Sequence, residues 1–378
     1  MLYRFANCEL DTERHELRFE GELRHIEPQV FDLLALLADH PGRLISRDEI
    51  IEAVWGGRIV SESAIAARIN AARRGIKLVV PVEASPAGKA IAKARCGTPV
   101  DEQRVRFCRS RDGTSLAFAS FGAGPALVRA GTWLSHLEHD WQSPLWRPFL
   151  AELGTTFRVT RYDQRGNGLS DWTARSMTLN DFVDDLEAVV DSAGLDRFVL
   201  YGVSQGAPIA VAYSVRHPER VSHLVLQGGF AQGRMVRNER EREQGLALQT
   251  LIRLGWGKPE GPFIQAFSSM FIPGGTPEQI TSLTELQRIT TSPENAARLR
   301  AAIDLFDVSG LLEKVRVPTL VFHARNDGVH PLEEGCKLAA GIPGAQLVML
   351  ESKNHVVVPH EPAYPKFFSE LRRFALAQ

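Results

Sequence analysis

A serine placed between two glycines, in Gly202-Val203-Ser204-Gln205-Gly206, is the segment of the sequence best suited to nucleophilic chemistry. It ends an apolar, β-rich run at residues 198–203 and precedes a helical segment at residues 207–216. In a strand–turn–helix of this kind, the glycines permit a strained turn that projects the central hydroxyl at the start of the helix. We therefore predict that Ser204 is a nucleophile; the alternative is a glycine-rich turn that holds an ordinary serine.

A serine hydroxyl is a weak nucleophile at neutral pH, so it needs a base, and the base needs an acid to orient it. Asp327 comes shortly after the apolar run at residues 319–323, and His355 comes shortly after the run at residues 346–350. Both side chains therefore follow the end of a predicted strand, in the chain order serine, aspartate, histidine. We predict a catalytic triad of Ser204, Asp327 and His355.

Other histidines fit the role of the base less well. His323 lies inside an apolar run, which favours a packed core residue, and neither His330 nor His360 directly follows a strand. His360 is close enough to His355 in the sequence to serve as a control for mutation. The run at residues 223–227 is followed by two glycines and a phenylalanine, so Asp327 has no close rival as the acid.

The elements that must position these residues form an α/β pattern across residues 102–378. Apolar runs typical of strands alternate with helical segments. The runs lie at 116–121, 126–130, 158–162, 198–203, 223–227, 319–323 and 346–350, and the helices include 179–193, 207–216 and 332–340. This alternation predicts a mostly parallel sheet with helices on both faces, with function gathered at the carboxyl ends of the strands.

An insertion with helical periodicity separates two of the predicted strands. It predicts a helical cap over Ser204, at about residues 230–312. Five large side chains in the cap could line an acyl pocket: Trp256, Phe263, Phe267, Met270 and Phe271. Aromatic residues at helical spacing more often belong to a core, and we favour that interpretation.

A second motif, Arg161-Tyr162-Asp163-Gln164-Arg165-Gly166-Asn167-Gly168-Leu169-Ser170, accompanies the serine turn. With both motifs, residues 104–378 resemble the α/β-hydrolase superfamily. The resemblance implies a carboxylester-type serine hydrolase that acts on a small ester or related acyl compound, with no metal or other cofactor. It implies an oxyanion hole of two backbone amides, one from Gln205 and one from Thr132 or Trp133. Asp163 and Arg165 are expected to tie the strand end to its neighbours rather than to act in catalysis.

The first hundred residues show a separate α+β pattern. Short alternating runs in residues 3–24 predict an antiparallel meander, and residues 28–38 predict a buried helix that starts with a proline. Residues 46–55 open with the capping-box form Ser-x-x-Glu and predict a second helix. A third helix is predicted at residues 61–76, with one apolar stripe and an opposite side of small, amide and basic residues.

This order of elements resembles the OmpR-type winged-helix DNA-binding domain over residues 3–76. The resemblance implies that the third helix enters the major groove of double-stranded DNA, with four contact residues: Arg68, Asn70, Arg73 and Arg74. The wing region, residues 77–98, departs from the family because it contains no aromatic residue. A winged-helix fold retained only for protein contacts is therefore the alternative.

The distribution of charge agrees with two domains joined by a linker. The chain carries a formal net charge of -1, yet residues 66–98 hold seven basic side chains against the single acidic Glu83. A local basic stretch can meet phosphate, although it is also typical of a solvated surface. We predict a winged-helix domain at residues 1–83, a linker at 84–101 and the hydrolase domain at 102–378.

Cysteine usage and hydropathy limit the class of protein. The four cysteines are scattered, with no Cys-x-x-Cys pair, and no apolar run approaches the roughly 18 residues that cross a bilayer. We therefore expect a cytoplasmic protein without disulfides, structural zinc or membrane contact. The alternative to a dedicated hydrolase is an effector-responsive transcription regulator in which the hydrolase fold senses a small molecule. A regulator that binds two half-sites is expected to be a homodimer.

Overall fold

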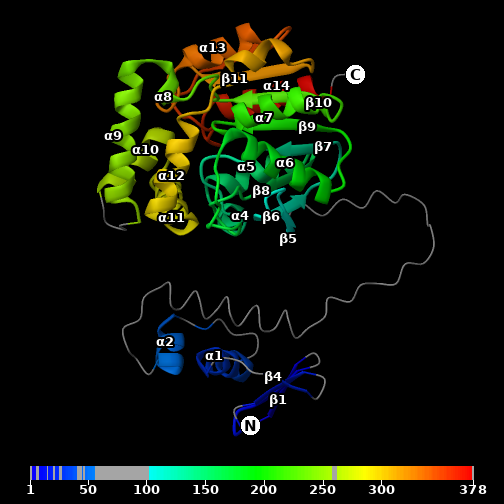
Figure 1. Ribbon diagram of the computed structural model, residues 1–378, viewed down its shortest axis with the longest axis vertical. Helices are drawn as coiled ribbons and strands as arrows, with labels where there is room; N and C mark the ends of the chain where they lie inside the picture. The colour runs from blue at the N-terminus through cyan, green and yellow to red at the C-terminus, as the bar shows by residue number, and fades with distance from the viewer. Residues whose placement is uncertain are drawn as a thin grey trace, which may run out of the picture. The chain divides into compact units, whose positions relative to one another are not determined.

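The computed structural model divides the chain into two compact units, residues 1–93 and 94–378 (Figure 1). It describes residues 2–5, 8–14, 16–19, 22–24, 28–40, 45, 47–55, 102–257 and 262–376. Each unit is considered by itself below.

The first unit contains a four-stranded antiparallel sheet followed by two helices. The strands pair in the order β1-β2-β3-β4, and Leu10 and Leu17 pack with Phe31 and Leu34 in a small core. The elements are β1 (Leu2–Phe5), β2 (Cys8–Asp11), β3 (Glu16–Phe19), β4 (Glu22–Arg24), α1 (Pro28–Asp39) and α2 (Arg47–Trp55). The predicted meander and the first two predicted helices are confirmed. The third helix with Arg68, Asn70, Arg73 and Arg74, and the wing region at residues 77–98, lie outside the described residues.

The second unit is built on an eight-stranded sheet in the order β12-β11-β10-β9-β7-β8-β6-β5. The six strands from β12 to β8 run parallel, whereas β6 and β5 pair antiparallel at one edge. The strands are β5 (Arg104–Arg109), β6 (Ser115–Phe121), β7 (Ala126–Arg129), β8 (Arg158–Tyr162), β9 (Phe198–Val203), β10 (Val221–Gln227), β11 (Thr319–Ala324) and β12 (Gln346–Leu350). The predicted mostly parallel sheet is confirmed. β5 was not predicted, because three arginines interrupt its apolar residues.

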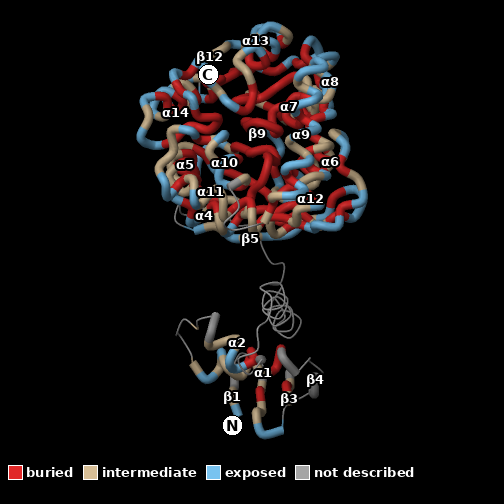
Figure 2. The backbone as a smooth tube through the Cα atoms, turned by 90° about the vertical axis from the view of Figure 1, so that its left-hand side faces the viewer, coloured by how far each residue is buried: buried red, intermediate tan, exposed pale blue. Residues whose placement is uncertain are grey.

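Helices cover both faces of this sheet, as predicted. Side chains of a strand alternate between its faces, so in β9 Leu200 joins one core and Tyr201 the other. The first core includes side chains of α6 (Leu179–Ser192), α7 (Gly206–Arg216) and α13 (Leu332–Gly341); the second includes side chains of α5 (Trp146–Gly154) and α14 (Ala363–Ala375). The short helix α4 (Leu137–Gln142) precedes α5. Figure 2 shows the buried strands in the middle of the unit and exposed residues on the outer helices.

The segment predicted to form a cap is helical. It contains α8 (Arg234–Arg237), α9 (Glu239–Gly255), α10 (Pro262–Phe271), α11 (Pro277–Thr290), α12 (Pro293–Ile303) and the 3-10 turn η1 (Ser309–Lys314). Figure 1 shows α9 to α12 grouped on one side of the sheet. Thr276 caps α11 through a capping box, and Ser292 caps α12, each followed by a proline in the first turn.

The loop after β8 ties neighbouring elements together. The Asp163 carboxylate accepts hydrogen bonds from the Ser135 hydroxyl (2.8 Å) and the amides of Leu137 and Leu169. The buried Arg165 guanidinium donates to both oxygens of Asp185, at 2.6 and 2.8 Å. These contacts agree with the structural role expected of Asp163 and Arg165, since a buried charge is stable only when it is paired.

Candidate active site

The turn after β9 holds Ser204 in a strained backbone conformation. Its φ angle is 55°, in the left-handed region that non-glycine residues rarely adopt. A Cβ atom on Gly202 would lie 2.5 Å from the Gly206 carbonyl oxygen, and one on Gly206 would lie 2.9 Å from the Gly131 oxygen. Both glycines are therefore required by close backbone approach, which is the physical reason for the Gly-x-Ser-x-Gly pattern.

Asp327 and His355 come together at the carboxyl ends of β11 and β12. The His355 Nδ1 and Asp327 Oδ2 atoms are 2.7 Å apart, and the backbone amides of Val329 and His330 donate to Asp327 Oδ1. Burial acts to raise the pKa of Asp327, but the neighbouring His355 and the hydrogen bonds from His355 and Val329 outweigh it, so this pKa is lowered. The carboxylate is therefore ionised when it accepts from the imidazole.

Ser204 and His355 line the same pocket. His355 is buried, and its Nε2 atom has no hydrogen-bond partner among the described residues. The other walls are mostly apolar side chains from the sheet edge, α5, α10 and α11: Trp133, Leu134, Leu145, Trp146, Val203, Phe271, Leu283 and Val356, together with Thr132 and Gln287. The predicted serine and histidine thus line one pocket.

The backbone around the cavity offers unpaired amides. Gln205 is the N-cap residue of α7, and Thr132 and Trp133 follow β7. No backbone carbonyl in the described part of the chain accepts from the amides of Gln205, Thr132 or Trp133. The Thr132 hydroxyl donates to the Val203 carbonyl and holds the two loops together at 3.1 Å. The oxyanion hole of Gln205 with Thr132 or Trp133 stays a prediction, and both Thr132 and Trp133 stay candidates for the second donor.

The competing histidines occupy other positions. His323 is fully buried within β11 and its Nε2 atom lies 3.0 Å from the His330 carbonyl oxygen, which confirms it as a core residue. The His330 ring lies 5.5 Å from the His355 ring, and burial together with Arg234 and Arg237 keeps the pKa of His330 well below its ordinary value. His360 is exposed and its ring contacts the Gly274 carbonyl oxygen.

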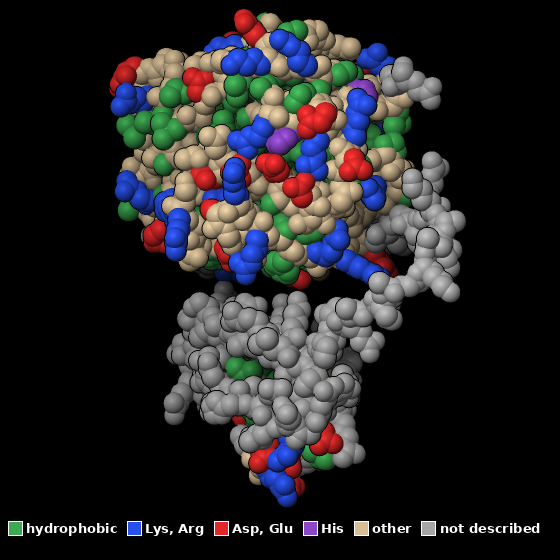
Figure 3. All heavy atoms as spheres, turned by 45° about the vertical axis from the view of Figure 1, so that its right-hand side comes forward, with side chains coloured by type: hydrophobic (Ala, Val, Ile, Leu, Met, Phe, Trp, Pro, Cys, Tyr) green, Lys and Arg blue, Asp and Glu red, His purple; other side chains and the backbone are tan. Residues whose placement is uncertain are grey.

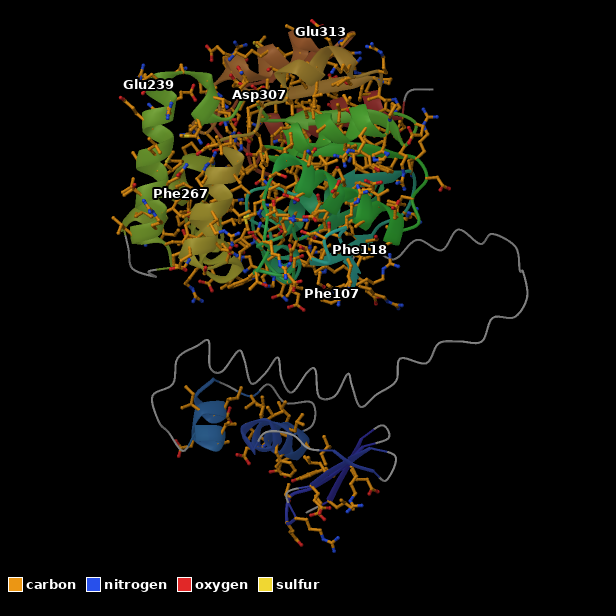
Figure 4. The ribbon with its side chains drawn as sticks, in the orientation of Figure 1. Phe107, Phe118, Glu239, Phe267, Asp307 and Glu313 are labelled. Atoms are coloured by element: carbon orange, nitrogen blue, oxygen red, sulfur yellow. The ribbon has the colours of Figure 1, made fainter. Side chains whose placement is uncertain are left out.

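The aromatic residues of the cap mostly pack with one another. Trp256 and Phe267 make edge-to-face contacts with Trp133 at ring-centre distances of 5.9 and 6.3 Å; Phe267 is labelled among the cap side chains in Figure 4. Met270 is exposed, and only Phe271 of the five residues considered lines the cavity, 5.8 Å from the His355 ring. The core interpretation therefore holds for Trp256 and Phe267.

Sequence reasoning missed several cavity residues. Trp146 on α5 and Leu283 and Gln287 on α11 carry no local motif, and only the packing of distant helices brings them together. Gly228 was also missed: it has a φ of +55°, and a Cβ there would lie 3.0 Å from the His355 ring. Its position directly after β10 was the available signal.

The described residues contain no group of three or more histidine, cysteine, aspartate or glutamate side chains that could hold a metal ion. None of the described helices is both long enough and apolar enough to cross a membrane.

Comparison with known proteins finds a match for each unit. Residues 135–362 match the family model described as the alpha/beta hydrolase fold, and residues 21–84 match the model described as "Transcriptional regulatory protein, C terminal".

Individual relatives cover most of the second unit. The chain is 31% identical over 260 residues to the 2-hydroxy-6-oxononadienedioate/2-hydroxy-6-oxononatrienedioate hydrolase of Klebsiella pneumoniae. The aligned region covers 67% of this chain and 84% of that protein. The esterase EaEST of Exiguobacterium antarcticum superposes with a TM-score of 0.60 at 23% identity, over 75% of this chain and 100% of its own. The esterase RhEst1 of Rhodococcus gives a TM-score of 0.59 at 24% identity, over 72% and 98%. These two structures establish the shared fold.

Proposed function

The chain belongs to the α/β-hydrolase family and carries a transcriptional-regulator C-terminal domain ahead of the hydrolase fold, and on this premise we propose that it is a serine hydrolase. Its substrate is a small ester or related acyl compound. One observation carries the proposal: the strained Ser204 shares a cavity with His355, whose other ring nitrogen is 2.7 Å from the buried Asp327 carboxylate.

The proposed reaction follows from the roles these groups can take. Ser204 Oγ attacks the acyl carbon while His355 Nε2 accepts the hydroxyl proton, and His355 then returns this proton to the leaving alcohol. Asp327 holds the proton on Nδ1 and stabilises the charged imidazole. The amides of Gln205 and of Thr132 or Trp133 stabilise the oxyanion. Water, activated by the same histidine, then attacks the acyl-enzyme and releases the acid.

In the free protein, no hydrogen bond joins Ser204 Oγ to His355 Nε2. Catalytic hydrogen bonds are often long before substrate binds and shorten in the reacting complex, so this geometry is compatible with the proposed roles.

The cavity argues for a different substrate from that of the Klebsiella relative, whose name includes a dicarboxylate. None of the residues that line the cavity is a lysine or an arginine. Burying a carboxylate without a cationic partner costs several kcal/mol, on the order of the penalty for any unpaired buried ion. We therefore do not extend that substrate to this chain.

Labelling with a fluorophosphonate probe tests the proposed nucleophile. We expect the wild-type protein to be labelled and Ser204→Ala to show no labelling, because the probe phosphonylates only an activated serine. His355→Ala should also lose labelling, whereas His360→Ala should keep it. Equal labelling of wild type and Ser204→Ala would contradict the assignment of the nucleophile.

A second candidate function is supported by the family match at residues 21–84. In it, the hydrolase fold binds and slowly hydrolyses an effector that alters DNA binding by the first unit, so the protein acts as a homodimeric regulator in the cytoplasm. On the face of the second unit shown in Figure 3, basic and acidic side chains are interspersed. The match at residues 21–84 favours DNA contact by the first unit, for which Arg68, Asn70, Arg73 and Arg74 are the proposed contacts.

A gel-retardation assay tests this regulatory function. The full-length protein is used first to select fragments from genomic DNA and then to retard them in the gel. We expect the double variant Arg73→Ala/Arg74→Ala to weaken binding by at least about tenfold, because each lost phosphate contact reduces counterion release. Ser204→Ala should bind DNA as the wild type does. Its change in DNA binding on addition of an effector should last longer, because this variant does not hydrolyse the effector. If no fragment is retarded even at low salt, the first unit is a protein-contact module instead.

A further inference from the structure

Several residues that line the cavity beside Ser204 carry a buried polar atom without a hydrogen-bond partner among the described residues. Sixteen buried side-chain nitrogen and oxygen atoms in the described residues lack a hydrogen-bond partner, and four of them belong to the twelve residues that line this cavity. These four are Trp133 Nε1, Trp146 Nε1, Gln287 Oε1 and His355 Nε2. A buried polar atom without a partner is destabilising, and a bound ligand can supply the missing partners.

Gln287 is the most informative of them, because its amide orientation is determined by its neighbours. Ser268 Oγ donates its single hydrogen to the Ile264 carbonyl oxygen at 2.8 Å. It can therefore only accept from the Thr284 hydroxyl and from Gln287, at 2.8 and 2.9 Å. In this arrangement Gln287 presents its NH₂ group to Ser268, and its carbonyl oxygen is the free acceptor.

A free acceptor in a buried position needs a donor. Gln287 is 1% exposed, and its Oε1 atom has no partner in the described part of the chain. The cavity walls contain no lysine, arginine, aspartate or glutamate, so the group that meets this oxygen is uncharged. Such a group is an O–H or an N–H of the ligand.

We propose that Gln287 is a specificity-determining residue that selects uncharged acyl compounds bearing a hydroxyl or amide N–H, which donates to its Oε1 atom. Ser268 is a positioning residue, because it fixes which end of the amide Gln287 presents. The unpaired indole N–H groups of Trp133 and Trp146 add two donors suited to a carbonyl oxygen of the same compound. This inference rests on the proposed hydrolase function and adds the class of substrate.

Two matched pairs of esters test it, each pair differing by a hydroxyl in place of a methyl group. The first varies the acyl part (4-nitrophenyl 3-hydroxybutanoate and 3-methylbutanoate), and the second varies the alcohol part (2-hydroxypropyl and 2-methylpropyl butanoate). The readout is the ratio of kcat/KM within a pair, since a general loss of activity cancels in it. We expect wild type to prefer the hydroxyl ester by at least about tenfold in one pair.

The variants separate selection from folding. Gln287→Met keeps the size of the side chain and should bring the ratio to about one or below, and Ser268→Ala should lower it while leaving Gln287 in place. Gln265→Met makes the same substitution at an exposed position of α10 and should keep the wild-type ratio. A wild-type ratio near one in both pairs would show that water serves the amide oxygen and would overturn the proposal, as would an unchanged ratio in Gln287→Met.

A binding measurement keeps this test independent of catalysis. In Ser204→Ala protein, the hydroxyl ester should raise Tm more than its methyl analogue does, and Ser204→Ala/Gln287→Met should lose that difference. If no ester is hydrolysed but this difference is present, the serine hydrolase proposal fails and the assignment of Gln287 stands. If esters are hydrolysed and the difference in Tm is absent, the serine hydrolase proposal stands and the assignment of Gln287 fails.

Discussion

Replacing Ser204 by alanine should lower kcat/KM for ester hydrolysis by at least about 10⁴-fold, because it removes the atom that forms the acyl-enzyme. His355→Ala should cost about as much. The double variant should be no slower than either single variant, since the two groups act as one unit and the residual rate comes from the amides and substrate binding. Steady-state assays with a 4-nitrophenyl ester measure all three.

The control for this experiment is His360→Ala. His360 is exposed and contacts a backbone oxygen of Gly274 rather than Asp327. We expect its activity to stay within about twofold of wild type, as for most surface substitutions. A larger loss in His360→Ala than in His355→Ala would reverse the assignment of the base.

Asp327→Asn should reduce kcat by about 10⁴-fold with little effect on folding. Two backbone amides, from Val329 and His330, donate to Asp327 Oδ1, so an asparagine keeps its oxygen there and turns its NH₂ toward His355 Nδ1. His355 must then carry its proton on Nε2, and that nitrogen can no longer accept the proton of Ser204. The isosteric change therefore traps the wrong tautomer.

Kinetics combined with thermal unfolding test this explanation. Asp307→Asn is the matched control, since Asp307 is an exposed carboxylate that accepts from Ser309 and does not line the cavity. We expect wild-type activity from that variant. Because the pKa of Asp327 is lowered, its carboxylate stays ionised throughout the neutral range, and activity should not change there through its titration. A near-normal kcat in Asp327→Asn would exclude Asp327 as the orienting acid.

Much of the candidate site was predictable because it follows strand ends. Ser204, Asp327 and His355 come just after β9, β11 and β12, and the carboxyl ends of parallel strands meet at one edge of a sheet. Short continuous apolar runs marked those strands, and the glycines marked the turn. Other local signals placed the first unit: alternating residues marked the meander, and a proline and a capping box marked the first two helices.

The remainder of the site was not predictable from local patterns. The apolar spacing of Trp256 and Phe267 fits a core as well as a pocket, and only their contacts with Trp133 distinguish the two. Gln287 stands in an ordinary helical segment, and nothing nearby in the sequence marks its amide as unpaired. The orientation of the Gln287 amide depends on Ser268, which lies on a different helix of the cap.

The sequence alone therefore predicted the proposed reaction centre, and the tertiary structure decided the shape and chemistry of the space around it. The proposed nucleophile, acid and base each belong to a strand–loop unit whose conformation is set by neighbouring residues. The cavity is formed by side chains from the loop after β7 and from β9, α5, α10 and α11, which are far apart in the chain. Periodicity reports which face of a helix is buried, but it does not report which other helix covers that face. That choice depends on packing between elements, and substrate selection depends on it in turn.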